Sequence, residues 1–520
     1  MPIYVDRNLI NPFTFASPLE KFIGSREFNR ICEEIKLYRR YEGDLTVWSD
    51  YVKPDDIDYE PSQITLNYPR KLIDTTAAWQ FEKEPKVVVP PDVIDDPAQM
   101  VQPGYTPSAE QQKENTRAKA KERLLTWVWD DNRMHEKLLA AAKDRAITRT
   151  GVYARLHYDK RRGDIRIYWH PSTEVIPVYD EWDCDELKEV HFAAFLDEEQ
   201  TRYWRLSYYL EWDEAAQNYD CKVEEWILDD RMQPVEQRTP RQSMGLDFIP
   251  VVQVPADKLT GSTEGFSELE KIIDISEEID RKLSDFSDAL KFEMFAITVL
   301  KNVDEDPKNP LKKSPAAIWN LGEGTPETGM PHAEKLDGGF QFKEAIEAYI
   351  DRMYRGMHDL IEVPLLNTAD MKVGGLNDVA LQQLYAMIIS KTQRAWVVWQ
   401  SRLQTLNEYI LRYMKARQDH PRFKYDKEML KQVDEYYDSE IVFNLPMPQD
   451  REALITLLGD ELANGMESIK GAIARSGKEN AEAKFYEIME ERNFMQRASD
   501  PYNTAEDETR IEEETEEEEE

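Results

Sequence analysis

One stretch of the sequence, residues 264–300, constrains the fold more than any other part. Its apolar residues recur three or four positions apart throughout, which predicts one continuous helix with a single apolar stripe. At about 1.5 Å per residue, this helix would be on the order of 50 Å long. The stripe consists of Ile272, Ile275, Ile279, Leu283, Phe286, Leu290, Met294 and Ile297. So narrow a stripe requires a neighbour along the whole helix, either from the same chain or from another subunit.

The residues after this helix supply a candidate neighbour. Residues 302–339 are rich in proline and glycine and hold one strand-like piece, 316–321, which predicts a compact excursion. A helix returns over 340–361, and a short loop over 363–376 leads into a second long helix, 377–416. Its expected inward positions are Leu381, Leu384, Tyr385, Ile388, Trp396, Trp399, Leu403, Leu406 and Ile410. The pattern alone is equally compatible with an ordinary helical domain that carries one inserted loop.

The first 262 residues mix helices and strands. Periodicity predicts helices over 25–41 and 69–81, a loop over 89–108, and a helical stretch over 109–151. The apolar period then changes from 3.6 to 2, which predicts a hairpin of strands 152–158 and 164–169. Further strands are expected over 174–179, 189–195, 203–212, 221–228 and 248–254. Residues 1–262 are therefore predicted to form one α+β unit, and the chain as a whole is α+β and mostly helical.

The C-terminal part is predicted to hold short helices and an acidic tail. Helices are expected over 451–464, 468–476 and 481–492, with Ser468 as an N-cap. Residues 505–520 contain 11 acids and one arginine. Such a segment cannot bury an apolar core, so it is predicted to be a disordered, solvated tail.

Charge excludes several classes of function. The chain holds 66 Lys+Arg against 102 Asp+Glu, a net charge of −36, of which the tail accounts for −10. A sequence-specific DNA-binding protein needs a basic surface, and so does a protein that binds anionic lipid. A transmembrane helix is not expected, because no apolar stretch of about 18 uncharged residues occurs. Neither a secretory signal nor a disulfide framework is indicated; Cys32, Cys184 and Cys221 are expected to be thiols in a reducing compartment.

No motif of catalysis or metal binding is found. The sequence has neither a phosphate-binding loop, nor a serine nucleophile elbow, nor a zinc-ligand spacing. The acidic run 180–186 lacks the central glycine and the closing glutamate of a calcium loop. We therefore predict no catalytic residue, metal or cofactor. A hydrolase that uses two carboxylates distant in sequence stays as an open alternative.

Several stretches, taken in order, resemble portal proteins of tailed bacteriophages, the head-to-tail connectors. No single stretch is specific for this family, but the set of stretches in this order is. The stretches are 37–43, 67–85, 151–171, 265–274, 375–381 and 443–468.

The resemblance implies a portal-type subunit with an α/β wing, a long helical stem, a small clip, a tunnel loop and a helical crown. The implied segments are wing 1–262, first stem helix 263–300, clip 301–339, second stem helix 340–362, tunnel loop 363–376, long wing helix 377–420, crown 421–504 and disordered acidic tail 505–520.

The resemblance also implies a function without enzymatic activity. About twelve subunits would form a ring at one capsid vertex, made in the host cytoplasm and built into the virion. Double-stranded DNA would be packaged through its tunnel by the terminase motor and later ejected. The implied partners are the terminase large subunit, the major capsid and scaffolding proteins, and the neck or head-completion proteins, with no membrane. The alternative is an acidic scaffold or chaperone that masks basic partners with its Glu-rich tail.

Two sets of site residues follow from the resemblance. The first would contact DNA non-specifically in the tunnel loop: Lys372, Asn367, Gly374 and Gly375. The second would pack subunits in the stem: Ile272, Ile275, Ile279, Leu283, Phe286 and Leu290. An acidic tunnel wall repels the duplex and lets it slide, so Lys372 would make one of few attractive contacts. Lys372 could equally be an ordinary solvated loop lysine.

Overall fold

The computed structural model describes residues 24–55, 59–96, 106–197, 201–214, 217–294, 298–301, 332–335, 343–365, 383–446 and 451–476, and singly 484 and 488. The chain divides into two compact units. The first comprises Met1–Asn367 and Tyr385–Pro446, and the second comprises Thr368–Leu384 and Met447–Glu520.

Two antiparallel sheets form the centre of the first unit. The three-stranded sheet has the order β3-β2-β9, and the five-stranded sheet has the order β4-β5-β6-β7-β8. Their strands are β2 (Val152–Asp159), β3 (Asp164–Pro171), β4 (Val175–Tyr179), β5 (Leu187–Phe195), β6 (Arg202–Asp213), β7 (Asn218–Asp229), β8 (Pro234–Ser243) and β9 (Val251–Val254). The predicted hairpin is confirmed, since Val152 pairs with Pro171 and Asp159 with Asp164. β8 is a strand that periodicity did not predict.

Six helices surround these sheets among the described residues. They are α2 (Ser25–Glu42), α3 (Tyr68–Phe81), α5 (Ala109–Asp131), α6 (Met134–Ile147), α10 (Ala386–Arg417) and α11 (Lys427–Gln432). The prediction of one helical stretch over 109–151 needs correction, because it breaks between α5 and α6. Asn132 causes the break: its amide donates to the carbonyl oxygens of Val128 and Ile165 and accepts from the Ile167 N–H. Its side chain thus ties the end of α5 to β3.

The main core lies where α10 crosses the sheets. Trp399, Leu403, Leu406 and Ile410 are buried as predicted, whereas Leu384 is 43% exposed, contrary to the prediction. The short strand β1 (Lys86–Val88) pairs with β12 (Glu440–Val442), which joins two distant parts of the chain. The mixture of helices and sheets confirms the α+β class.

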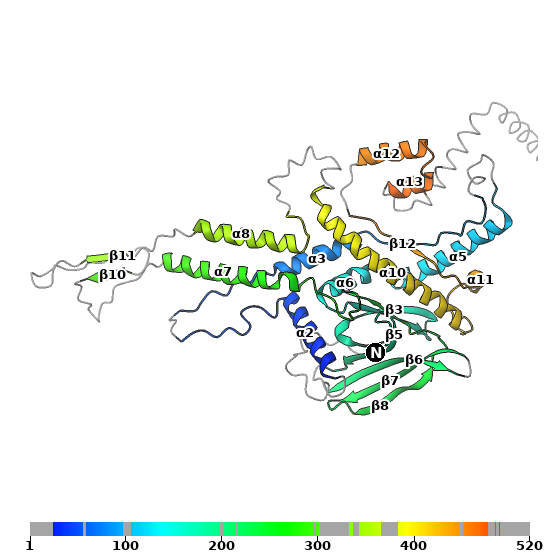
Figure 1. The fold of residues 1–520 in the computed structure, drawn as a ribbon, viewed down its shortest axis with the longest axis horizontal. Coiled ribbons are helices and arrows are strands. Elements are labelled where there is room, and N and C mark those ends of the chain that lie inside the picture. The colour runs from blue at the N-terminus through cyan, green and yellow to red at the C-terminus, as the bar shows by residue number, and fades with distance from the viewer. Residues whose placement is uncertain are drawn as a thin grey trace, which may run out of the picture. The chain divides into compact units, whose positions relative to one another are not determined.

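Two helices extend away from the sheets and lie side by side (Figure 1): α7 (Glu270–Met294) and α8 (Lys343–Leu360). The predicted helix over 264–300 is therefore shorter at both ends. Residues Thr298–Lys301 form a strand, β10, paired with β11 (His332–Lys335). The strand-like piece expected at 316–321 lies outside the described residues.

The second unit contains α12 (Arg451–Ala463) and α13 (Ile469–Arg475). The predicted N-cap is confirmed, since Ser468 Oγ accepts from the Gly471 N–H at 2.9 Å. Of the expected helix 481–492, only residues 484 and 488 are described, and both are helical. The acidic tail 505–520 lies outside the described residues.

Candidate functional site

The apolar stripe of α7 packs against α8 of the same chain. Ile272 and Ile279 are buried, and Ile275 and Leu283 are partly buried against the same cluster. The side chains of α8 in this cluster are Ile350, Met353, Tyr354 and Met357. Over this half of α7, the neighbours that the sequence left undecided thus come from the same chain: α8, and Leu72 and Ile73 of α3.

The far half of the same stripe is less well covered. Phe286 is half-buried and Leu290 is 40% exposed. An open groove of about 350 Å³ lies between α7 and α8, and its lining on α7 runs from Ile279 through Leu283 to Phe286. One chain therefore fills only part of the space beside its own stripe.

The residues that lead into α7 are held by α6 and the loop that follows it. The Gly265 N–H donates to the Arg149 carbonyl at 2.7 Å, and the Glu268 N–H donates to the Ala146 carbonyl at 2.9 Å. A Cβ on Gly265 would lie 2.3 Å from the Asp257 carbonyl oxygen, so only glycine fits. These bonds replace helical ones, which explains why the helix begins at Glu270 rather than at 264.

Ion pairs reinforce this entry. Arg149 binds the carboxylate of Glu270 in the first turn of α7. Lys391 of α10 binds Glu268 at 2.6 Å. The start of α7 is therefore joined by charge to two further parts of the unit.

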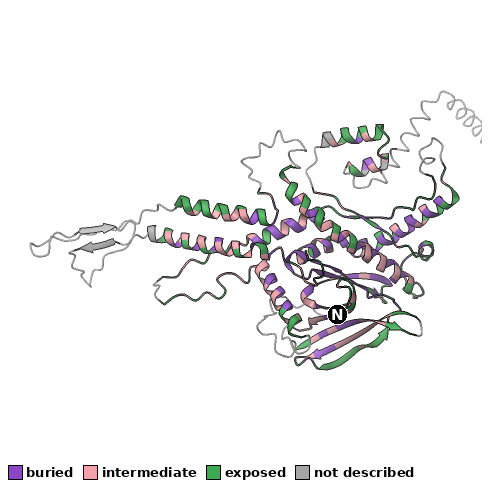
Figure 2. Cartoon of the chain, in the orientation of Figure 1, coloured by how far each residue is buried: buried purple, intermediate pink, exposed green. Residues whose placement is uncertain are grey.

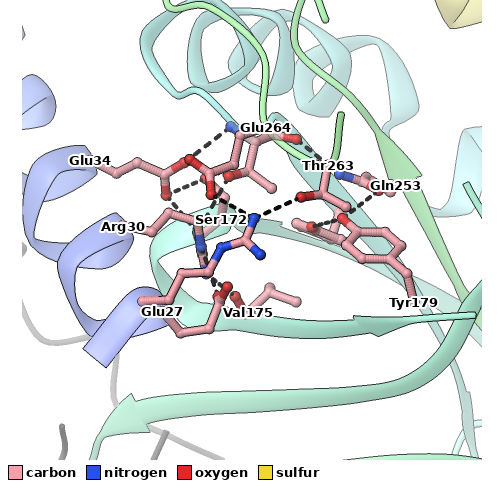
Figure 3. Close-up of polar contacts among 12 residues, drawn as sticks. Glu27, Arg30, Glu34, Ser172, Val175, Tyr179, Gln253, Thr263 and Glu264 are labelled. Atoms are coloured by element: carbon pink, nitrogen blue, oxygen red, sulfur yellow. Dashed lines mark hydrogen bonds and ion pairs between the residues drawn. The ribbon is translucent and has the colours of Figure 1, made fainter. Parts of the chain in front are cut away.

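A buried polar network ties α2 to the sheets beside this entry (Figure 3). Arg30 donates to the Glu34 carboxylate at 2.9 Å and to the Ser172 and Val175 carbonyls at 3.1 and 2.7 Å. Glu34 is fully buried and also accepts from the Thr150 N–H and hydroxyl and from the Ser172 hydroxyl. Burial alone would lower the pKa of Arg30, but the carboxylates of Glu34 and Glu27 raise it above its ordinary value. Arg30 is therefore charged in the folded protein.

Sequence reasoning missed this network, although a signal for it exists. Glu27, Arg30 and Glu34 follow the i, i+3 and i, i+4 spacing of ion pairs on one helix face. The same spacing is usual on solvated faces, so it does not by itself reveal burial.

The predicted tunnel-loop residues Asn367, Lys372, Gly374 and Gly375 all lie outside the described residues. The geometry of the α7–α8 hairpin is thus the part of the predicted site that the structure describes.

Within the described ranges, one group of side chains is close enough to share a metal ion: Asp183, Cys184 and Asp185. Asp185 already pairs with Lys258 and, at 3.6 Å, with Arg402, and these pairs and a bond from Lys258 lower its pKa. These pairs account for Asp185 as the partner of two bases. No helix in the described part of the chain has the length and apolar character that a bilayer span requires.

Comparison with known families identifies the chain. Residues 21–519 match the family described as phage portal protein, SPP1 Gp6-like. The chain belongs to this family. The resemblance inferred from the ordered stretches is confirmed, and the chain functions as a phage portal protein. Among curated proteins, none matches the sequence.

Membership has general consequences for the portal protein. The family implies an oligomeric ring at a capsid vertex, passage of DNA, and interactions with capsid proteins and terminase. It is a structural family rather than an enzymatic one. The α7–α8 hairpin is accordingly considered below as a site of assembly.

Proposed function

We propose that this portal protein forms a closed ring of about twelve subunits in which α7 and α8 are the stem. Residues 1–262 and 377–420 are the wing, 301–339 the clip, 363–376 the tunnel loop and 421–504 the crown. Double-stranded DNA is driven through the ring by the terminase large subunit and is later ejected. Major capsid, scaffolding and neck proteins attach to the ring, which is made in the host cytoplasm.

The observation that carries this proposal is the incomplete cover of the hairpin. α8 is exposed over most of its length (Figure 2). Large apolar side chains on the two helices stay accessible, namely Leu290, Tyr349 and Leu360, at 40%, 43% and 51% exposure. Together with the open groove, they offer a neighbouring subunit an apolar surface to bury.

The charge of the chain suits a tunnel through which DNA slides. A protein that grips phosphates with many bases binds DNA tightly and stalls it, whereas net negative charge keeps attractive contacts few. Lys372 in the proposed tunnel loop would supply one such contact, supported by Asn367, Gly374 and Gly375.

Native mass spectrometry and negative-stain microscopy of the purified protein test the ring. We expect one closed species of about a dozen chains with a central hole. Monomers or dimers alone at micromolar concentration would contradict the proposal.

The loop is tested separately in a packaging assay with Lys372→Ala. We expect intact rings with altered DNA packaging or retention. Unchanged packaged DNA would remove the proposed contact while leaving the ring in place.

A further inference from the structure

The stem helix α7 carries a second stripe, which is polar and buried. Ser276, Asp280, Ser284 and Asp288 follow one another at intervals of four residues and are 5%, 4%, 2% and 8% exposed. Four residues of helix advance about 6 Å. Buried polar side chains need hydrogen-bond partners, so the stripe calls for a partner with a repeat of about 6 Å.

An extended segment of the α2–α3 connection, Tyr59–Asn67, supplies that partner; we call it the strap. The Leu66 N–H donates to Asp280 at 3.0 Å, and the Ile64 N–H donates to Ser284 Oγ at 2.9 Å. The Ser62 N–H donates to both carboxylate oxygens of Asp288 at 3.0 Å.

The geometry explains why these three bonds form together. Alternate residues of an extended chain lie about 6.6 Å apart, close to the 6 Å step of the stripe. The amides of residues 62, 64 and 66 therefore meet successive side-chain acceptors of α7. The side chains of α7 thus accept hydrogen bonds from the strap, as the carbonyl groups of a neighbouring strand would.

Two further hydrogen bonds hold the strap, one at its middle and one at its end. The Trp48 indole N–H donates to the Ile64 carbonyl at 3.1 Å. The Asn67 amide donates to the Tyr41 carbonyl at 2.9 Å, which joins the end of the strap to α2. Detachment from α7 would therefore move the strap as a tethered segment.

The two carboxylates of the stripe differ electrostatically. Burial raises the pKa of Asp280 to about 6, although the Leu66 N–H opposes the rise. Burial would also raise the pKa of Asp288, but hydrogen bonds from Ser62 and the ammonium of Lys291 lower it overall. Asp288 is thus stabilised as an anion, whereas Asp280 is stabilised as the neutral acid.

No lone cation compensates Asp280 among the described side chains near it. Arg40 is bound to Glu277, and Arg281 lies near Glu277 and Glu278. The groups that face Asp280 or line the adjoining cavities are Arg40 of α2, Tyr68 of α3, Glu277 of α7, and Glu347 and Asp351 of α8.

We propose that the strap is a proton-sensitive latch on α7, whose grip strengthens when Asp280 is protonated and weakens when Asp280 ionises. The neutral acid still accepts from Leu66 through its carbonyl oxygen and leaves no buried charge. A released carboxylate titrates near its ordinary value of about 4. The grip therefore strengthens as the pH falls from about 6 toward 4, and it is weakest above 6.

The latch rests on the structure of α7 and not on the ring. If α7 is a stem helix as proposed above, the latch would set how freely the stem moves relative to α2 and α3. In a portal, that freedom would matter when DNA passes.

Hydrogen exchange of the Ile64 and Leu66 amides in the full-length protein tests the latch. After correction for intrinsic exchange, we expect wild-type protection to fall about fourfold from pH 5.5 to 7.5. Asp280→Asn keeps an acceptor oxygen and removes the titration. This variant should lose the pH dependence and be protected more than wild type at pH 7.5, by up to about a hundredfold, which is the ratio that two pKa units give.

Two further variants make the test decisive. Asp285→Asn changes an acid on the same helix whose side chain is 70% exposed, so it should behave as wild type. Ser284→Ala removes the middle acceptor, so Ile64 should lose protection at both pH values while the pH dependence persists.

The latch is overturned if wild-type protection does not change between pH 5.5 and 7.5, or if Asp280→Asn retains the wild-type dependence. If Asp280→Asn does not fold, as judged by circular dichroism, the wild-type profile and the Ser284→Ala variant still decide. Native mass spectrometry of the same samples reports on the ring, so failure of the ring and failure of the latch are separate results.

Discussion

The proposed wing and the proposed stem solve the burial of apolar side chains in different ways. In the wing, α10 crosses two sheets, and Trp399 in its middle is completely buried. In the stem, α7 and α8 share one narrow seam and leave Leu290 and Leu360 exposed. The main core of the wing is therefore built within one chain, whereas we propose that the accessible side chains of the stem hairpin meet a neighbouring subunit.

The difference shows how one region of a subunit can stabilise the folded monomer while another contributes free energy to assembly. The wing supplies a core that keeps the monomer folded before assembly. The stem keeps enough apolar surface accessible to gain free energy when a neighbour covers it. Changes in the two regions should therefore have different consequences, on assembly in the stem and on unfolding in the wing.

The largest effect is expected from two charges in the seam, Ile279→Asp with Leu283→Asp. Each introduces a carboxylate without a partner into the apolar contact with α8, and a ring repeats the defect in every subunit. We expect complete loss of rings in native mass spectrometry. The wing should keep its sheets, as measured by circular dichroism.

A matched variant separates shape from polarity. Ile279→Leu with Leu283→Met keeps apolar volume and should still form rings. Unchanged assembly of the doubly charged variant would refute the role of the seam and remove the contrast between the two regions.

The next effect concerns the wing alone. Trp399 packs edge-on against Phe81 at 5.0 Å between ring centroids and donates to Gln80 at 2.9 Å. Trp399→Ala should lower the free energy of unfolding by about 3–5 kcal/mol, because it leaves a cavity and removes the donor to the Gln80 side-chain oxygen. Denaturant unfolding of the monomer measures this. The control Val397→Ala, at a residue 71% exposed on the same helix, should change it by less than about 0.5 kcal/mol.

A smaller effect is expected at the network that joins α2 to the sheets. Glu34→Gln removes the buried negative charge that faces Arg30 and should cost about 2–3 kcal/mol in unfolding free energy. Glu33→Gln changes a 46%-exposed partner of Lys36 and should be nearly neutral. Equal effects of the two changes would mean that the buried network contributes no more than a surface pair.

Local periodicity predicted much of this fold, and its failures have physical causes. The β2–β3 hairpin and the helices α2 and α3 follow from apolar spacing that their own residues carry. β8 was missed because it is exposed almost throughout and contains Pro234 and Pro240, so only its pairing with β7 makes it a strand. The predicted helix is longer than α7 at its start because Gly265 and Glu268 donate their N–H groups to Arg149, in the loop after α6, and to Ala146 of α6.

Prediction of the candidate site from local periodicity is limited in the same way. The apolar stripe of α7 is visible in the sequence, and so is the spacing of Ser276, Asp280, Ser284 and Asp288. The polar stripe was missed because polar residues on a helix usually face water. The burial of this stripe is explained only by the strap, which lies some 220 residues earlier in the chain and donates hydrogen bonds to it.

The smallest effect is expected from removing the charge of the acidic tail, which belongs to neither the core nor the seam. Deleting residues 505–520 removes −10 per subunit, roughly −120 from a ring of about twelve, and leaves an acidic body of −26 per chain. Because repulsion between solvated charges is screened by salt, the deletion should favour rings several-fold at about 0.05 M salt and have little effect at about 0.5 M. Native mass spectrometry across that range measures the difference. Rings that need the tail at every salt concentration would show instead that the tail makes a specific assembly contact, and stem and wing together would then not suffice for the ring.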